Sequence, residues 1–351
     1  MVARRVVSSA AGFFPWQVPL AQRWLGQRDR FAHAWLIQGA PGIGQLEFAQ
    51  AGAASLLCET PENGLACGRC QACRWVAAGN HPDLRRLRPD AVAAQEGEAE
   101  EEGSGKKQLS KEIRVEQIRG LMPWFNMASH RGGWRVALLY PAEALNVISA
   151  NALLKILEEP PGRTVFLLVA QAPDRLLPTL VSRCRRLPLP VPTHDEALGW
   201  LSQQGVHDAS TWLAAAGGAP LLALQAAQAG GGPVPQWLEG FLDLAQCGGA
   251  PAGLADALVA QDAAAWIDAA QRLWTDLSLA AHGLPLRYYP AQASAIEILA
   301  RSSDPVRLAQ TARWLQDQQR LAQHTLNPKF LADHAARMLL SSFGKPVRAA
   351  S

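Results

Sequence analysis

The sequence lacks long apolar runs and a large excess of charge of either sign. None of its 351 residues belongs to a run of 18 consecutive apolar residues, about the length that a transmembrane helix requires. Residues 1–9 contain two arginines but not the apolar core of a signal peptide. We therefore expect a cytoplasmic protein without membrane contact. A net charge of +3 does not by itself indicate a nucleic-acid partner, because affinity for phosphates comes from clustered cations.

A further absence lies in a glycine-rich segment, residues 39–46, which follows the apolar run 34–37. The segment keeps the glycine spacing of a phosphate-binding loop of the form G-x-x-x-x-G-K-[ST]. Gln45 stands where that loop has its lysine, and Leu46 where it has the hydroxyl that holds Mg²⁺. Taken alone, the segment is better interpreted as an ordinary glycine turn between a strand and a helix. The residues concerned are Gly39, Gly42, Gly44, Gln45 and Leu46.

Four of the six cysteines gather in the pattern C-x8-C-x2-C-x2-C, as Cys58, Cys67, Cys70 and Cys73. Gaps of two residues suit thiolates that converge on one tetrahedral Zn²⁺, and an iron–sulfur cluster is the main alternative. Gly64 and Gly68 fit the tight turns of such a site. Four protein ligands leave no position for a catalytic water, so we expect structural zinc. Cys184 and Cys247 are isolated, and we interpret both as small buried apolar residues.

The chain has enough apolar residues, 49% of the total, for two or three domains. Residues 135–140 and 164–169 are largely apolar runs, separated by a helical pattern that ends at two prolines. Strands of this kind alternating with helices predict an α/β domain with a parallel sheet covered on both faces. Before them, residues 89–111 carry a run of glutamates and few large apolar residues, so we expect a flexible acidic loop on the surface.

Two further motifs carry a resemblance to a known family. Residues 151–161 have the sequence NALLKILEEPP, and residues 182–184 form an SRC motif. Together they resemble the motifs of the clamp-loader branch of the AAA+ ATPases. The resemblance extends from residues 14–16, with the sequence FPW, to residues 326–328, although the last third of the chain matches in character more than in motif.

The resemblance implies three domains. Residues 1–190 would form an AAA+ nucleotide-binding-like domain with a RecA-like parallel sheet, into which a zinc module (58–73) and the acidic loop are inserted. Residues 191–232 would form a small helical lid, and residues 233–351 an all-α collar domain used for oligomerisation. The implied partners are the ATPase subunits and the other subunits of a hetero-pentameric clamp loader, the sliding clamp, and primed DNA contacted through the assembled complex.

The family motifs also imply an activity, ATP hydrolysis, that we expect this chain to lack. Counted back from Asn151, the two acidic residues of the family's Walker B motif fall on Tyr140 and Pro141, which can neither organise a metal ion nor polarise water. Both halves of an ATP-hydrolysing site would then be missing. Gly42 and Gly44 still leave backbone N–H groups for weak nucleotide binding.

By the same resemblance, Arg183, within Ser182-Arg183-Cys184, is an arginine finger. It would reach the ATP site of a neighbouring subunit, where a guanidinium stabilises the charge that develops on the γ-phosphate. The ordinary alternative is a solvated basic edge that also includes Arg185 and Arg186. The chain would thus act as a stator, without ATPase or polymerase activity of its own, in a complex that loads the sliding clamp on primed DNA.

Two other functions stay open from the sequence. The chain could be an active AAA+ ATPase with an atypical phosphate-binding loop, although Gln45 and Tyr140 argue against it. It could instead be a zinc-knot nucleic-acid-binding protein. That function needs a basic, aromatic surface near the cysteines, where the sequence offers Arg69, Arg74 and Trp75.

Overall fold

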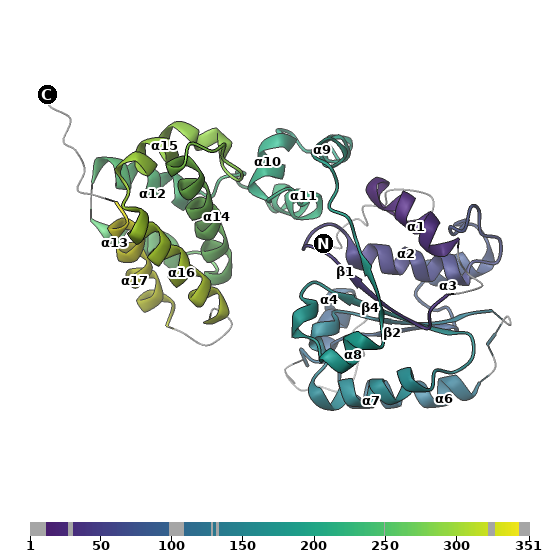
Figure 1. Cartoon of the computed structure of the whole chain (residues 1–351). Helices are drawn as coiled ribbons and strands as arrows, with labels where there is room; N and C mark the ends of the chain where they lie inside the picture. The colour runs from purple at the N-terminus through teal and green to yellow at the C-terminus, as the bar shows by residue number, and fades with distance from the viewer. Residues whose placement is uncertain are drawn as a thin grey trace, which may run out of the picture. The chain divides into compact units, whose positions relative to one another are not determined.

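The structure is a computed structural model, which describes residues 12–26, 31–97, 109–127, 129–130, 133–248, 250–321 and 327–343 (Figure 1). The chain divides into two compact units, Met1–Glu196 and Ala197–Ser351. Each unit is described by itself. Within the described ranges, no helix is long and apolar enough to cross a membrane.

The first unit is built around a five-stranded parallel sheet. Its strands are β1 (Ala34–Gln38), β2 (Leu84–Leu87), β3 (Arg135–Leu139), β4 (Thr164–Ala170) and β5 (Arg185–Pro188). Their order in space is β2-β3-β4-β1-β5, and every neighbouring pair runs parallel. All seven residues of the central strand β4 are buried, which explains why its sequence is almost continuously apolar. The predicted parallel sheet is confirmed.

A different helical layer covers each face of this sheet (Figure 1). Because neighbouring residues of a strand point to opposite faces, Ile37 packs with α1 and α2, whereas Leu36 packs with α5 to α8. Fully burying an aliphatic side chain of this size contributes about 1.5–3 kcal/mol. The helices of this unit are α1 (Val18–Leu25), α2 (Gln45–Leu57), α3 (Gln71–Ala77), α4 (Asp90–Gln95), α5 (Val115–Arg119), α6 (Leu121–Asn126), α7 (Val147–Glu158) and α8 (Pro178–Ser182).

Part of the predicted acidic loop 89–111 has regular structure. Helix α4 occupies its first residues, so the expectation of a loop is wrong there, while residues 98–108 lie outside the described residues. Three alanines favour the helix. Asp90 in its first turn forms an ion pair with Arg114, whose Nη2 lies 3.1 Å from Oδ2. The N–H of Ala91 donates to the carbonyl oxygen of Ser110, which ties the helix to the far end of the segment.

In the described residues the second unit contains helices and no strands. The helices from residue 194 onward are α9 (His194–Gln203), α10 (Ala209–Ala215), α11 (Pro220–Ala229), α12 (Gln236–Cys247), α13 (Pro251–Val259), α14 (Ala263–Ala281), α15 (Ala293–Ser302), α16 (Pro305–Leu321) and α17 (Pro328–Ser341). Thr193 and Glu196 form a capping box before α9, with N···O distances of 2.9 and 3.3 Å. Asn327 caps α17 by accepting the N–H of Lys329. The division into a lid (191–232) and a collar (233–351) stays a prediction.

A buried carboxylate fixes one connection of the second unit. Asp276 in α14 is fully buried. It accepts hydrogen bonds from the backbone N–H groups of Arg287, Tyr288 and Tyr289, with shortest distances of 2.8, 3.0 and 2.7 Å. Three donors to one carboxylate compensate its loss of hydration. The segment between α14 and α15 is therefore held on the side of α14.

Replacing this carboxylate tests how strongly it holds the unit. Asp276→Ala leaves three backbone N–H groups without their acceptor, so we expect the free energy of unfolding to fall by about 3 kcal/mol. Urea denaturation of the purified chain measures the change. Asp256→Ala removes an exposed carboxylate from α13 and should change stability by less than about 0.5 kcal/mol. Equal stability of the two variants would contradict the role given to Asp276.

Candidate functional site

The glycine-rich loop joins the carboxyl end of β1 to the start of α2. Gly42 and Gly44 have positive φ angles of 77° and 92°, in the left-handed region that favours glycine. A Cβ on Gly44 would lie 2.6 Å from a ring carbon of Phe14. Local packing thus requires these glycines, whether or not the loop meets a phosphate.

The side chain of Gln45 closes onto the loop itself. It is 4% exposed, and its Nε2 donates to the carbonyl oxygens of Gly39 and Ala40, both 2.6 Å away. A primary amide has two N–H donors, so both are engaged inside the loop. Leu46, the next residue, packs against the apolar core. The loop offers neither a cation at the lysine position nor an oxygen for a metal ion.

Residues near the start of the described chain bind the other end of the loop. Trp16 Nε1 donates to the carbonyl oxygen of Ile43 at 3.1 Å, and Gln17 Nε2 donates to Ile43 and Gly44 at 3.0 and 2.8 Å. The rings of Phe14 and Trp16 stack with centroids 4.9 Å apart. In the sequence these residues appeared only as part of the family resemblance. No sequence pattern indicates their contacts with the loop, because the contacts join positions 26 or 27 residues apart.

A closed polar cluster occupies the position of the Walker B carboxylates. Tyr140 follows β3, is 3% exposed, and donates its hydroxyl to both carboxylate oxygens of Glu96 at 3.0 and 2.9 Å. Burial raises the pKa of this phenol. Arg88 Nε lies 2.8 Å from Glu96 Oε2, and its guanidinium stands over the Tyr140 ring. Pro141 begins a turn, as expected for a strand end. Sequence analysis assigned Glu96 to the acidic loop and missed this cluster.

The SRC motif places its three side chains in three environments. Ser182 ends α8, and its Oγ donates to the carbonyl oxygen of Thr179. Cys184 lies in the apolar core, where burial raises its thiol pKa to about 12, so its predicted burial is confirmed. Cys247, by contrast, is exposed, and that prediction is wrong. Arg183 stays at the surface, directly before the buried Cys184, with a side chain 36% exposed. Its role as a finger stays a prediction.

The guanidinium of Arg183 has two contacts within the chain. Nη1 donates to the carbonyl oxygen of Thr179 at 3.2 Å, and Nη2 forms an ion pair with Glu158. Glu158 is the last residue of α7 and belongs to the LEEPP sequence. The two motifs that carried the resemblance are therefore in direct contact.

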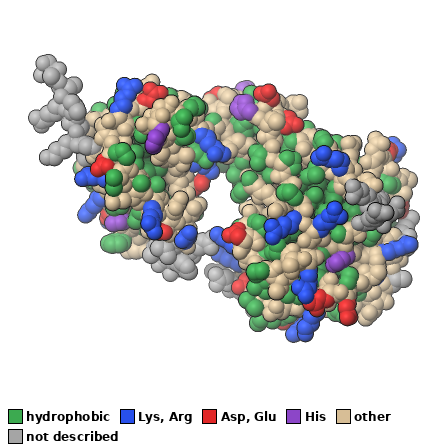
Figure 2. All heavy atoms as spheres, in the orientation of Figure 1, with side chains coloured by type: hydrophobic (Ala, Val, Ile, Leu, Met, Phe, Trp, Pro, Cys, Tyr) green, Lys and Arg blue, Asp and Glu red, His purple; other side chains and the backbone are tan. Residues whose placement is uncertain are grey.

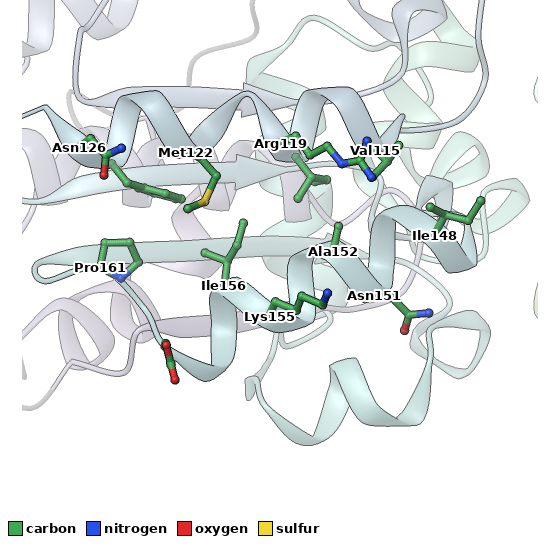
Figure 3. Close-up of a pocket in the computed structure, with 13 residues that line it drawn as sticks. Val115, Arg119, Met122, Asn126, Ile148, Asn151, Ala152, Lys155, Ile156 and Pro161 are labelled. Atoms are coloured by element: carbon green, nitrogen blue, oxygen red, sulfur yellow. The ribbon is translucent and has the colours of Figure 1, made fainter.

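The NALLK sequence divides between the core and a groove. Leu153 of α7 is buried against the sheet, whereas Asn151, Ala152 and Lys155 line a groove between α7 and the pair α5–α6 (Figure 3). The groove has a volume of about 630 Å³. Arg119 lines it from the opposite side. Helix α7 thus offers polar side chains on one side and supports the SRC motif at its end.

The four clustered cysteines form a candidate metal centre. The Sγ atoms of Cys58, Cys67, Cys70 and Cys73 lie within 4.8 Å of one another. The Cys58 and Cys70 sulfurs are 3.9 Å apart, close to the separation of about 3.8 Å expected for two thiolates on a tetrahedral Zn²⁺. All four are free thiols. Donors of this kind at these distances could hold a metal ion.

Backbone N–H groups point at the sulfurs of this centre. Those of Cys67, Cys70 and Cys73 donate to the sulfur of the preceding cysteine in the cluster, at 3.3, 3.4 and 3.4 Å. The hydroxyl of Thr60 donates to Cys67 Sγ, and this contact lowers the pKa of Cys67 to about 6. Gly68 has the positive φ angle, 72°, that such a turn often needs. Burial raises the pKa of Cys58 and Cys73, so these contacts favour the thiolate, the form of cysteine that binds metals, at Cys67 and Cys70.

The surface around this centre is mixed in charge. Arg69 forms an ion pair with Glu62 at 2.6 Å, which neutralises one of the cations that a nucleic-acid site would need. Trp75 packs edge-on against His81 and His130. On the face shown in Figure 2, the described Lys and Arg side chains are scattered among acidic and apolar ones. This distribution does not favour a nucleic-acid surface.

A family match lies in the part of the chain that holds the candidate site. Residues 22–193 match the family described as DNA polymerase III, delta subunit. The chain is 43% identical to DNA polymerase III subunit delta' of Pseudomonas aeruginosa, over 61% of this chain and 61% of that protein. It is 36% identical to the Escherichia coli subunit of the same name, over 58% of this chain and 56% of the relative. It also resembles the Escherichia coli subunit tau, at 34% identity over 44% of this chain and 21% of tau.

The alignments with the two delta' relatives thus span about three-fifths of their length. The family match, residues 22–193, covers the region that holds the glycine-rich loop, the cysteine cluster and the SRC motif. Through residues 22–193, just under half of its length, the chain is similar to the family of DNA polymerase III delta' subunits.

Proposed function

We propose that this chain is a non-hydrolysing clamp-loader subunit of a DNA polymerase III holoenzyme. It would act as a stator in the cytoplasm, in a hetero-pentamer with the ATPase subunits gamma or tau and with delta, and the complex would load the sliding clamp on primed DNA. The observation that carries this proposal is the closed state of both halves of the nucleotide site in a chain similar to the delta' family. Gln45 engages its own loop, and Tyr140 pairs with Glu96. The first unit would then be an AAA+ domain that has kept its fold and lost its chemistry.

Restoring the two loop residues tests whether the proposed lack of ATP hydrolysis depends on Tyr140 and Pro141 as well as on the loop. Gln45→Lys combined with Leu46→Thr returns the cation and the hydroxyl, but Tyr140 and Pro141 still supply no carboxylate for Mg²⁺ or water. We expect no ATP hydrolysis above background by the purified wild-type chain or by the double variant. Steady-state phosphate release from each chain alone measures it. Turnover by the wild-type chain would instead support an active ATPase with an atypical loop.

The contribution of this chain to ATP hydrolysis would be made in trans by Arg183. Its side chain is exposed, while Leu180 and Cys184 on either side are buried and anchor its backbone. A guanidinium held at the surface can enter the ATP site of a neighbour and stabilise charge on the γ-phosphate. In GTPases such fingers contribute roughly 10³–10⁵ in rate.

Arg183→Ala tests the finger in the reconstituted complex with gamma or tau, delta, sliding clamp and primed DNA. We expect normal folding and assembly, and DNA-stimulated ATP hydrolysis reduced by roughly tenfold or more at the ATP site that Arg183 faces. Arg175→Ala, which removes an exposed arginine from the turn before α8, should leave the rate unchanged. Unchanged hydrolysis and clamp loading by the Arg183 variant would overturn the assignment.

The cysteine cluster would hold one structural Zn²⁺. The donor set is four sulfurs at tetrahedral spacing, and N–H groups stabilise the thiolate form. The bound ion would link the end of α2 to the start of α3, because Cys58 and Cys70 are the C-cap and the N-cap of these helices. Its role would be to order residues 58–73, which bury few apolar side chains of their own.

Metal analysis and one cysteine pair test the zinc site. We expect one zinc per chain by elemental analysis and no visible absorption of an iron–sulfur cluster. Cys70→Ser should lose most of the zinc and lower the melting temperature, because structural zinc sites contribute on the order of 10 kcal/mol in isolated peptides. Cys247→Ser, at an exposed and isolated cysteine, should retain both. Full zinc content in the Cys70 variant would exclude the proposed ligand set.

A further inference from the structure

The surface ion pair between Glu158 and Arg183 has a rigid foundation. Glu158 ends α7, and Arg183 directly follows α8. The neighbouring side chains Leu157, Leu180 and Cys184 are 2%, 1% and 8% exposed and belong to the same apolar core. The close-packed core therefore fixes the separation of the two backbones, and the pair does not depend on a mobile loop.

Two contacts hold the Arg183 guanidinium and leave some of its N–H donors unused. Nη2 pairs with Glu158, and Nη1 donates to the carbonyl oxygen of Thr179 at 3.2 Å. Holding a long side chain at two points removes much of its rotamer freedom before any partner arrives. Because a guanidinium has five N–H donors, others stay available for phosphate oxygens. The 36% exposure of the side chain leaves a path to them.

We propose that Glu158 is a positioning residue for Arg183, so that the guanidinium is already oriented when a neighbouring subunit presents its ATP. The inference rests on the proposed function of Arg183 as a finger. Glu158 acts through Arg183 and does not itself contact the nucleotide. Prior orientation should speed the chemical step more than it tightens ATP binding, because the finger meets charge that develops in the transition state.

Glu159 provides a matched control for this proposal. It is the adjacent residue and carries the same charge, but it lines the groove between α7 and α5–α6. Within the ranges that the structure describes, Glu159 forms no ion pair with a cationic side chain. Glu158→Gln and Glu159→Gln thus remove equal charge at adjacent positions just before the same pair of prolines, and only the first removes the carboxylate that faces Arg183.

The experiment compares four variants in the complex reconstituted with gamma or tau, delta, sliding clamp and primed DNA: Glu158→Gln, Glu159→Gln, Arg183→Ala, and Glu158→Gln combined with Arg183→Ala. Gel filtration checks assembly, and steady-state kinetics gives kcat and KM for ATP. We expect Glu158→Gln to lower kcat by about half or more of the decrease that Arg183→Ala causes. The KM for ATP should change less than about twofold. Glu159→Gln should match the wild type, and the double variant should match Arg183→Ala alone.

The other outcomes separate the two hypotheses. If Arg183→Ala lowers kcat and Glu158→Gln does not, the finger stands and the positioning role is wrong. A double variant clearly slower than Arg183→Ala would mean that Glu158 acts on another group, which also overturns the inference. If Arg183→Ala leaves kcat unchanged, the finger itself fails, and the positioning role fails with it.

Discussion

The first unit depends on the burial of a parallel sheet between two helical layers. The central strands β1, β3 and β4 are apolar on both faces, so the chain is stable only when helices cover both sides. This constraint places the carboxyl ends of β1 and β3 at one edge, where the glycine-rich loop and Tyr140 follow. It also supports α7 and α8, whose buried leucines hold Glu158 and Arg183 in place. The glycine-rich loop, Tyr140 and the Glu158–Arg183 pair are thus all positioned by the buried sheet and the helices that cover it.

The glycine-rich loop keeps the glycine spacing of a phosphate-binding motif without its lysine and its hydroxyl. Gly44 is required because Phe14 and Gln17 pack where a Cβ would lie. Gln45 satisfies two loop carbonyls that would otherwise need other donors. At the carboxyl end of β3, Glu96 and Arg88 surround the phenol of Tyr140. The residues that stand at the positions of the motif's catalytic groups belong to the local packing, and they stabilise the fold without a nucleotide.

Features that repeat along the sequence were predictable, and features that depend on distant contacts were not. The apolar runs gave three of the strands to within about one residue at each end, and the cysteine spacing gave a cluster that the structure brings together. Glu96 was missed because a run of glutamates indicates solvation, while its partners lie 8 and 44 residues away. The exposure of Cys247 was missed because a single cysteine carries no periodicity. The contact of Arg183 with Glu158 joins two motifs that each looked complete alone.

The parallel sheet also gives the first unit a polarity, because all of its strands run in the same direction. The glycine-rich loop follows the carboxyl end of β1, whereas Arg183 lies two residues before the first residue of β5. Since the strands run in the same direction, these two features lie at opposite edges of the sheet, separated by the length of a strand, about 17–23 Å for five to seven residues. A guanidinium at one edge cannot serve a loop at the other edge of its own fold. Domains of this fold that contact one another through these two features associate head to tail. Their contact surfaces then differ on the two sides, and such an assembly has a direction.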